Sequence, residues 1–267
     1  MKKSRGKDVS AIDDFKKEVE LNIAALGADK SLSEKTLQWM IDGACHRYVY
    51  NFSCLGRPII QFPQDMVAIQ ELVWKIKPDL IIETGIAHGG SLVLSASMLA
   101  LLDMEEAIQS GGMLDPLRSR RKVLGIDIDI RDHNRAAIEA HPMCSRIQMI
   151  EGSSIAPEVI EKVREVAVGY ERVMVILDSN HTHEHVLAEL KAYAPLVSIG
   201  SYCVVFDTLV EDMPASMFSD RPWAPGNSPK TAVWEYLESD PSFEVDRVIQ
   251  DKLLITVAPD GYLKKIG

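Results

Sequence analysis

The densest group of chemically reactive side chains in the sequence lies between Asp178 and His185, which reads Asp-Ser-Asn-His-Thr-His-Glu-His. Carboxylate oxygens are preferred ligands of Mg²⁺ and Mn²⁺, and an imidazole can act as a general base. Asp207 ends the next apolar run, so two neighbouring strands could present Asp178 and Asp207 to one metal ion. The alternative is an aspartate that caps a helix. His183 and His185 diverge on a helix, which excludes a zinc pair of the HExxH type. We expect at most one of the three histidines to be catalytic, the others being solvated or capping the helix start.

A glycine-rich segment follows the first apolar run and reads Glu-Thr-Gly-Ile-Ala-His-Gly-Gly-Ser from Glu83 to Ser91. Glycines such as Gly85 and Gly89 allow a tight turn and a close approach to a ligand, and the next helix offers free N–H groups. The segment contains neither GxGxxG nor a GK[ST] phosphate loop. A pyrophosphate would repel Glu83, whereas a sulfonium and an amino group would be attracted. The alternative is an ordinary strand-to-helix turn.

Polar residues also follow the second and third apolar runs. Asp127 ends the run 122–127, where a carboxylate can accept hydrogen bonds from ribose hydroxyls. In an NAD-binding unit such an acid follows the glycine loop by about 20 residues. Asp127 lies 42 residues after Gly85, partly because of the stretch 109–121, so the spacing is inconclusive. Ser153 and Ser154 could bracket an adenine, with an ordinary turn as the alternative.

These side chains would be positioned by short apolar runs that alternate with helix-like stretches. The runs are 79–83, 122–127, 146–150, 172–178, 202–207 and 252–257, and the stretches include 91–103, 157–168 and 183–194. Almost continuously apolar runs indicate strands buried on both faces of a parallel sheet. The alternation predicts a doubly wound α/β sheet with helices on both faces. Right-handed crossovers place every strand-to-helix loop at the carboxyl edge, where the candidate residues would meet.

Three segments do not belong to this alternation. Residues 1–45 have helical periodicity at 11–26 and 33–44, and we interpret them as an N-terminal helical extension to a domain at 46–267. This extension could cap the active site or form an oligomer interface. Residues 209–229 contain four prolines and Trp223, which favours an ordered lid. The polar stretch 109–121 is predicted to be a surface excursion. Residues 50–65 could lie across a cofactor mouth or form a linker packed on the core.

The composition excludes several classes of protein. The 267 residues fit one large domain, and 39 acidic against 29 basic residues give a net charge of −10. This charge argues against nonspecific binding of nucleic acid or anionic membranes. There is no run of 18 apolar residues and no apolar region of a secretory signal. Four widely spaced cysteines indicate reduced thiols, so we expect a cytoplasmic protein.

The motifs together resemble a known family. They are IIETGIAHGGSL, GIDIDIR, VILDSNHTHEHV, GRPIIQFPQD, RPWAPGNSPKTAV and KLLITVAPDGYLKK. The chain resembles, over roughly residues 45–265, the cephalosporin hydroxylase/rhamnosyl O-methyltransferase family of S-adenosylmethionine (SAM)-dependent methyltransferases. The resemblance implies a mostly parallel, seven-stranded, Rossmann-like methyltransferase sheet with a reversed hairpin at its end. Residues 243–248 would supply the seventh strand.

The resemblance also implies roles for the candidate residues. The cofactor-binding residues would be Glu83, Gly85, Gly89 and Ser91 near the methionine part, Asp127 at the ribose, Ser153 and Ser154 near adenine, and Asp178. Metal-dependent relatives hold Mg²⁺ through an aspartate and a later Glu-Asp pair, which Asp178 and Asp207 match in part. They place a general base three residues after the first aspartate, at His181. The expected glutamate is replaced by Phe206, so Mg²⁺ binding would be weakened unless water, Glu211 or Asp212 compensates.

The sequence therefore predicts a SAM-dependent O-methyltransferase, assisted by Mg²⁺, in which Asp178 and His181 are catalytic. Its substrate would be a small hydroxylated molecule such as a sugar or natural product, and the chain would form a homo-oligomer. Three alternatives stay open. They are a nicotinamide-dependent oxidoreductase, a hydroxylase and a noncatalytic cofactor-binding subunit. For the hydroxylase, the sequence offers no convincing 2-His-1-carboxylate iron site.

Overall fold

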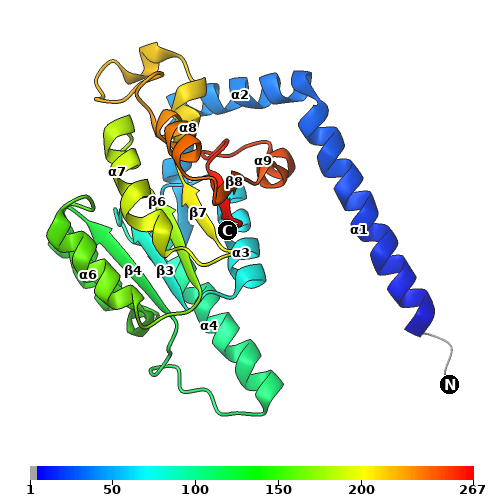
Figure 1. Ribbon diagram of the computed structural model, residues 1–267, viewed down its shortest axis with the longest axis vertical. Coiled ribbons are helices and arrows are strands. Elements are labelled where there is room, and N and C mark those ends of the chain that lie inside the picture. The colour runs from blue at the N-terminus through cyan, green and yellow to red at the C-terminus, as the bar shows by residue number, and fades with distance from the viewer. Residues whose placement is uncertain (1–4) are drawn as a thin grey trace.

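The computed structural model describes residues 5–267, and a seven-stranded sheet forms the centre of these residues (Figure 1). The strand order is β5-β4-β3-β6-β7-β9-β8. The strands are β3 (Leu80–Thr84), β4 (Lys122–Asp127), β5 (Ile147–Glu151), β6 (Val173–Leu177), β7 (Tyr202–Val205), β8 (Phe243–Val245) and β9 (Tyr262–Lys265). The first five are parallel, and β9 runs antiparallel to both β7 and β8. The predicted seven-stranded sheet with a reversed end is confirmed.

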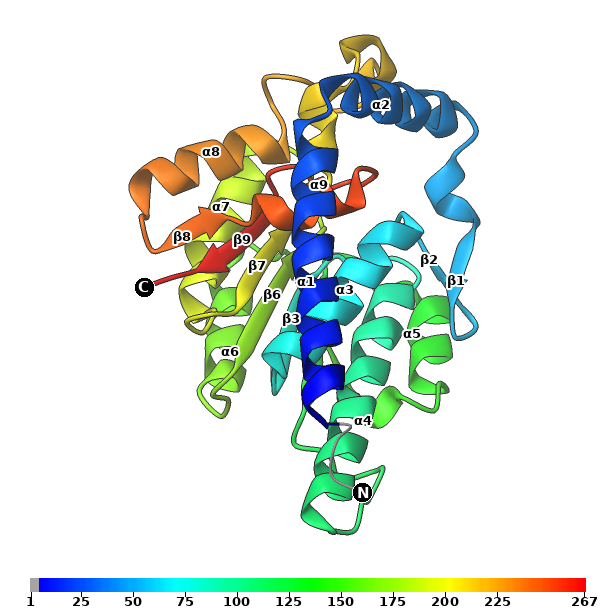
Figure 2. The same cartoon turned by 90° about the vertical axis from the view of Figure 1, so that its right-hand side faces the viewer.

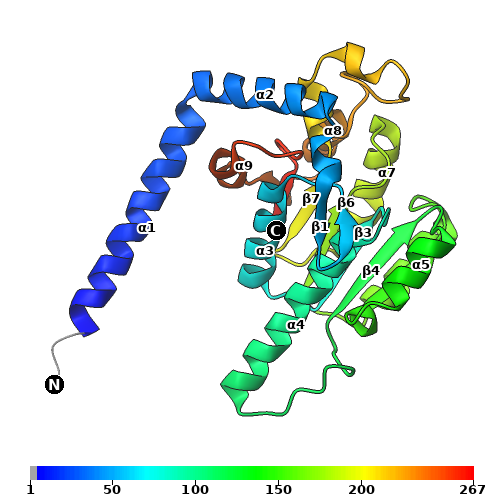
Figure 3. The same cartoon turned by 180° about the vertical axis from the view of Figure 1, so that it is seen from behind.

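Helices cover both faces of this sheet, as predicted (Figures 1 and 3). They are α1 (Arg5–Ala28), α2 (Lys30–Cys45), α3 (Pro63–Ile76), α4 (Gly90–Ser110), α5 (Asp132–Glu139), α6 (Pro157–Ala167), α7 (His183–Tyr193), α8 (Pro229–Ser239) and α9 (Arg247–Leu253). Helices α3, α4, α5 and α9 contribute to the core on one face, and α6, α7 and α8 to the core on the other. None of the helices described here combines the length and the apolar character that a bilayer crossing needs.

The alternation of side chains along each strand explains why the runs are apolar throughout. In β3, Ile81 belongs to the core beneath α3 and α4, whereas Ile82 belongs to the core beneath α6 and α7. Both residues are completely buried, because a strand with helices on both faces has no side that meets water. This arrangement also sends every β-to-α connection of the parallel strands to one edge of the sheet.

One predicted strand is wrong. Residues 252–257 form the end of α9 and a loop, and the terminal strand is β9. Leu254 has a positive φ of 58°, which interrupts an extended run. The buried carboxylate of Asp65 then accepts hydrogen bonds from Thr256 Oγ1 at 2.5 Å and from Val257 N at 2.9 Å. These bonds hold the segment against α3 rather than in the sheet.

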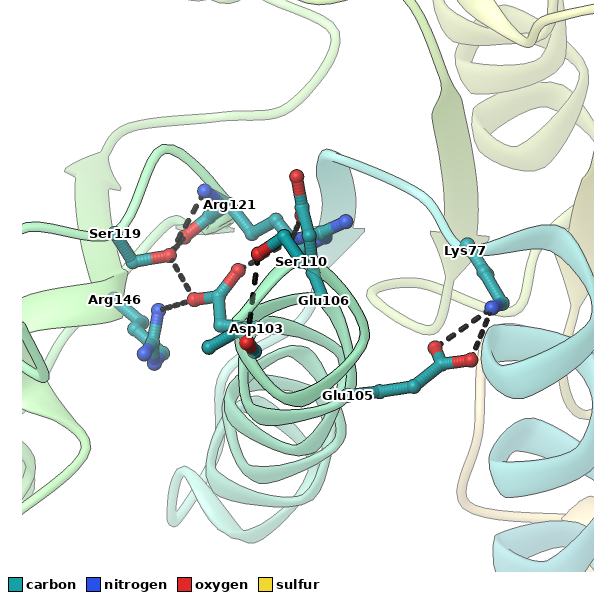
Figure 4. A network of polar contacts seen from close by, with 9 residues as sticks. Lys77, Asp103, Glu105, Glu106, Ser110, Ser119, Arg121 and Arg146 are labelled. Carbon is teal, nitrogen blue, oxygen red and sulfur yellow. Dashed lines mark hydrogen bonds and ion pairs between the residues drawn. The ribbon is translucent and has the colours of Figure 1, made fainter. Parts of the chain in front are cut away.

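The polar stretch after α4 is a surface loop, as predicted, and residues 111–118 are exposed. Its return to β4 is fixed by Asp103, which lies on α4 and is drawn in Figure 4. Asp103 accepts hydrogen bonds from Ser119 Oγ at 2.6 Å and Arg146 Nη1 at 2.5 Å, and it also pairs with Arg121. Because both arginines are largely buried, one carboxylate shared between them anchors the loop firmly.

The two N-terminal helices form an angle beside the sheet domain. Asp29 separates them and caps α2, since its side chain accepts a hydrogen bond from Leu32 N at 2.9 Å. Figures 1 and 3 show α2 at the end of the molecule where the loop 209–229 lies, while α1 projects away from the body.

Candidate active site

The glycine-rich loop after β3 is held in one shape by hydrogen bonds to its backbone. Asp127 at the end of β4 accepts bonds from Ile86 N at 2.8 Å and Ala87 N at 3.2 Å. Asn134 Nδ2 donates to Ala87 O at 2.9 Å. Arg57 donates to the carbonyl of His88 at 2.9 and 2.6 Å. The loop is therefore preorganised by groups from β4, α5 and the hairpin of β1 (Phe52–Cys54) and β2 (Arg57–Ile59).

Two positions of this loop require glycine, each for a different steric reason. Gly85 has φ of 90°, and a Cβ there would lie 2.0 Å from the carbonyl oxygen of Asp178. The glycine loop and the end of β6 therefore touch at this point. Gly89 has φ of 81° and packs against Ile138, so its place is in the turn rather than on a cavity wall. The hairpin packs on the loop as well, because a Cβ at Gly90 would lie 2.3 Å from Pro58 O.

Glu83 is a buried carboxyl group with an unused acceptor. It is 1% exposed, and Ser91 Oγ donates a hydrogen bond to its Oε1. The other oxygen has no partner among the residues described here. Burial raises the pKa of Glu83 to about 7, against the lowering effect of Ser91. A positively charged ligand group placed beside this carboxyl would favour its ionised form.

A cavity of about 120 Å³ lies at the same edge of the sheet. It is lined by Gly85, Ile126, Asp127, Ile128, Ser153, Ser154, Ser179, Asn180 and His185. Four of the predicted cofactor residues, Gly85, Asp127, Ser153 and Ser154, therefore share one wall. The other four predicted cofactor residues, Glu83, Gly89, Ser91 and Asp178, do not line this cavity.

His185 is a cavity residue that sequence reasoning placed wrongly, as a solvated or capping side chain. Its Nε2 lies 3.0 Å from Ser154 Oγ and 3.5 Å from Glu189, which is fully buried. Ser179 Oγ donates to Glu189 at 2.6 Å. Glu189 stands four residues after His185 on the inner face of α7, and an acid at such an apolar position was the available indication. His183 is 28% exposed at the start of α7, and its ring Nδ1 lies 2.8 Å from Thr231 Oγ1.

Asp178, His181 and Asp207 meet where β6 and β7 end. Each offers one ligand atom, and these three atoms all lie within 4.8 Å of one another. His181 Nδ1 is 3.6 Å from Asp207 Oδ2. Burial, followed by the negative charges of Asp207 and Glu83, raises the pKa of Asp178 well above its usual value. A divalent cation would offset this repulsion, and two carboxylates are chemically suited to Mg²⁺ or Mn²⁺, which leaves the imidazole free to act as a base.

Phe206 and the acids after Asp207 do not extend this cluster. Phe206 is 2% exposed and belongs to the core beneath α3 and α4. Glu211 accepts bonds from Gly226 N at 2.9 Å and Ser228 Oγ at 2.7 Å. Asp212 pairs with Lys230 Nζ at 2.5 Å. Both acids therefore fix the loop 213–228 and the start of α8.

That loop is ordered, as the sequence predicted, and it reaches the cluster through Trp223. The Trp223 ring meets the His181 ring edge-on, with centroids 4.7 Å apart and planes at 90°. Because the rings are in contact, the tryptophan restricts how the imidazole can turn. The loop thus forms one side of the candidate site.

Comparison with known proteins identifies the family of the chain. A family profile for rhamnosyl O-methyltransferase/CmcI matches residues 46–266. The chain is 29% identical over 238 residues to a rhamnosyl O-methyltransferase from Mycobacterium leprae (strain TN), covering 87% of this chain and 90% of that protein.

Two solved structures share the fold. One is CmcI described as a Mg–SAM structure, with TM-score 0.52, 18% identity and coverage of 82% of this chain and 78% of the other. The second is an apo TDP-rhamnose 3′-O-methyltransferase of calicheamicin biosynthesis, with TM-score 0.50, 18% identity and coverage of 76% and 79%. With the family profile spanning the whole sheet domain, the chain belongs to the rhamnosyl O-methyltransferase/CmcI family, as its motifs predicted.

Proposed function

We propose that the protein transfers the methyl group of SAM to a hydroxyl group of a sugar carried by a small molecule. One observation carries this proposal: the glycine loop and the end of β6 touch at Gly85 and Asp178. Gly85 lines the predicted cofactor cavity and Asp178 belongs to the Asp178–His181–Asp207 cluster, so the cavity and the cluster are adjacent. A methyl donor on one side and an acceptor hydroxyl on the other would meet there. The rhamnosyl O-methyltransferase relative and the Mg–SAM structure of CmcI support the choice of acceptor and cofactor.

The residues on the cofactor side fit SAM. Glu83 has a free buried acceptor for a cationic group, and Gly85 lines the cavity where the loop packs closely on the backbone of Asp178. Asp127 would accept a ribose hydroxyl in addition to its backbone bonds, and Ser153 and Ser154 would flank the adenine. Ser91 would act through Glu83, whose carboxyl group it orients. Gly89 would shape the turn.

The residues on the acceptor side fit general base catalysis. A cation held by Asp178 and Asp207 would lower the pKa of the acceptor hydroxyl. His181 accepts the hydroxyl proton while the oxygen forms its bond to the methyl carbon and the carbon–sulfur bond breaks, which leaves S-adenosylhomocysteine (SAH). Asp207 stabilises the imidazolium that forms, since its carboxylate lies 3.6 Å from Nδ1. Trp223 holds the imidazole in orientation through the edge-on contact.

A second cavity, of about 400 Å³, is suited to the rest of the acceptor. Leu209 and Asp212 of the turn η4 (Thr208–Asp212), which directly follows Asp207, line it together with Leu37 and Met40 of α2. Its wall also carries hydroxyl, carboxylate and amide groups, which can bind sugar hydroxyls. We infer that α2 forms one side of the acceptor site.

Titration calorimetry with SAM, SAH and NADH, each with and without Mg²⁺, tests this function. We expect the first two to bind at micromolar concentration and NADH not to bind. Tritium transfer from labelled SAM to a rhamnosylated acceptor should require Mg²⁺ and be lost in Asp178→Asn, with His183→Gln as the matched control. Binding of NADH alone, or of no ligand by the folded protein, contradicts the cofactor assignment. Binding without transfer to any of a panel of glycosylated acceptors contradicts the catalytic assignment.

A further inference from the structure

Helix α7 carries a polar stripe on the face that it turns toward the sheet. His185, Glu189 and Tyr193 follow one another at intervals of four residues, which places them on one face of the helix. Glu189 and Tyr193 are completely buried, and the His185 side chain is 19% exposed. Figures 1 and 2 show α7 on the same side of the sheet as α6, and both helices share one core with β6. Polar groups in such a place are costly to bury unless they are hydrogen-bonded.

Two of these side chains hold the segment that follows β5. The Tyr193 hydroxyl donates a hydrogen bond to the carbonyl oxygen of Ser154. His185 Nε2 lies 3.0 Å from the hydroxyl oxygen of the same serine. Ser154 and His185 both line the cavity of about 120 Å³ at the carboxyl edge of the sheet. The stripe therefore fixes both the backbone and the hydroxyl group of one residue of the cavity wall.

The neighbours of His185 determine the direction of each hydrogen bond. Ser179 Oγ donates to Glu189 Oε1 at 2.6 Å, so the one hydrogen of this hydroxyl is used there. His185 Nε2 lies 3.3 Å from the Ser179 oxygen and 3.5 Å from Glu189 Oε1. Toward the imidazole both oxygens are acceptors only, because a carboxylate has no hydrogen to donate. Nε2 must therefore carry the ring hydrogen and act as the donor.

The consequence for Ser154 is a hydroxyl hydrogen that stays free. Because Nε2 is a donor, the Ser154 oxygen accepts from it, and the hydroxyl makes no other hydrogen bond among the residues that the structure describes. A serine hydroxyl beside an unconstrained histidine could equally donate to the ring. Glu189 and Ser179 exclude that choice, so the hydrogen of Ser154 is left for a ligand in the cavity that this serine lines.

We propose that His185 is a positioning residue for the cofactor, which makes Ser154 a hydrogen-bond donor to a ring nitrogen of the adenine. This inference rests on the proposed function, in which Ser153 and Ser154 flank the adenine. The ring nitrogens of adenine are acceptors, whereas its exocyclic amino group is a donor. A serine that is fixed as a donor therefore binds one of the ring nitrogens. Glu189 acts through His185, because it does not line the cavity itself.

Calorimetry with SAH and its 1-deaza, 3-deaza and 7-deaza analogues tests this inference. Each analogue has a C–H group in place of one ring nitrogen of the adenine. We expect the wild-type protein to bind one of them about tenfold more weakly than SAH, because a buried donor then lacks its acceptor. In Ser154→Ala, that analogue and SAH should bind equally. In His185→Leu the difference should fall below about threefold, since the serine hydroxyl is no longer held. His183→Leu is the matched control on α7, because the ring of His183 contacts Thr231 and Glu235, and it should keep the full difference.

Two more variants separate positioning from packing. His185→Gln keeps an N–H donor on a side chain of similar reach and should retain most of the difference between SAH and the analogue. If His185→Leu does not fold because it leaves the buried Glu189 unpaired, His185→Leu/Glu189→Leu replaces it. SAH binding with no analogue weakened, or a full difference that persists in His185→Leu, overturns the role of His185 alone. Absence of SAH binding by the folded wild-type protein contradicts the proposed function, and this inference falls with it.

Discussion

Protonation of Glu83 should control how tightly the cofactor binds. Burial raises the pKa of this carboxyl to about 7, so the unliganded protein carries a proton there at pH 6. The sulfonium and amino groups of SAM favour the ionised form, so binding below pH 7 must expel the proton. SAM affinity should then be constant above about pH 8 and fall about tenfold for each pH unit below 7.

The magnitude follows from the same pKa. Its rise from 4.5 to about 7 corresponds to about 3 kcal/mol, and a side chain that is 1% exposed needs no discount for solvent. The pKa of Glu83 is higher in the folded than in the unfolded protein. Its contribution to the stability of the unliganded protein is therefore fully present below pH 4.5. It is lost as the pH rises through about 7. The bound cofactor should abolish the loss.

Calorimetry in two buffers of different ionisation enthalpy counts the protons released. With EDTA present, we expect about 0.9 proton released at pH 6 and about 0.1 at pH 8. Ser91→Ala removes the one hydrogen bond that lowers this pKa, so the transition should move to higher pH. Glu83→Gln should remove the pH dependence that this group causes, although Asp178 is also titratable nearby.

Two results would refute this reasoning. An affinity for SAM that is flat from pH 5 to 8 means that Glu83 does not meet the cationic part of the cofactor. A transition that survives in Glu83→Gln assigns the proton to another group, for which Asp178 is the first candidate.

Four further substitutions give separate outcomes. His181→Ala should lower kcat at least a hundredfold while SAH affinity changes less than twofold, and an unchanged kcat removes it as the base. Gly85→Ala should abolish SAM binding in calorimetry, because its Cβ would lie 2.0 Å from Asp178 O; Gly111→Ala, with a positive φ but no neighbour, is the control. Asp178→Asn should raise the melting temperature of the unliganded protein and abolish stabilisation by Mg²⁺, and persisting stabilisation would place the ion elsewhere. Met40→Trp should raise KM for the acceptor at least tenfold without changing SAM affinity, and an unchanged KM would exclude the larger cavity.

The sheet could be predicted because a strand that is buried on both faces is apolar at nearly every position. Runs such as Val173–Leu177 are apolar throughout, and each ends at a polar residue that belongs to the carboxyl edge. The failure at 252–257 has the opposite cause. Ile255, Thr256 and Val257 are β-branched and follow two leucines, but a carboxylate nearly 200 positions earlier, Asp65, accepts the hydrogen bonds of this segment. A local sequence pattern cannot predict a hydrogen-bond partner so far away along the chain.

The sequence predicts those site residues that stand at the ends of strands. It predicts less well the residues whose positions depend on how one helix or loop packs against another. Asp178, His181 and Asp207 come together as the topology requires. The contacts of His185 with Ser154 and the buried Glu189 depend on how α7 rotates over the sheet, which spacing alone does not fix. The place of Trp223 depends in turn on the bonds of the acidic pair after Asp207.

On the proposed mechanism, that acidic pair would connect metal binding to acceptor selection. Glu211 and Asp212 follow Asp207 closely, yet their carboxylates bind Ser228 and Lys230 and so hold the loop that carries Trp223 against His181. An acid used to hold this loop is not available to a metal ion, and Phe206 adds none because it is buried in the core. On the proposed mechanism, the two aspartates would supply the ligand charge and the next two acids would shape the acceptor side. Loss of Glu211 should consequently disturb the orientation of His181 and the choice of acceptor while leaving the two aspartates in place.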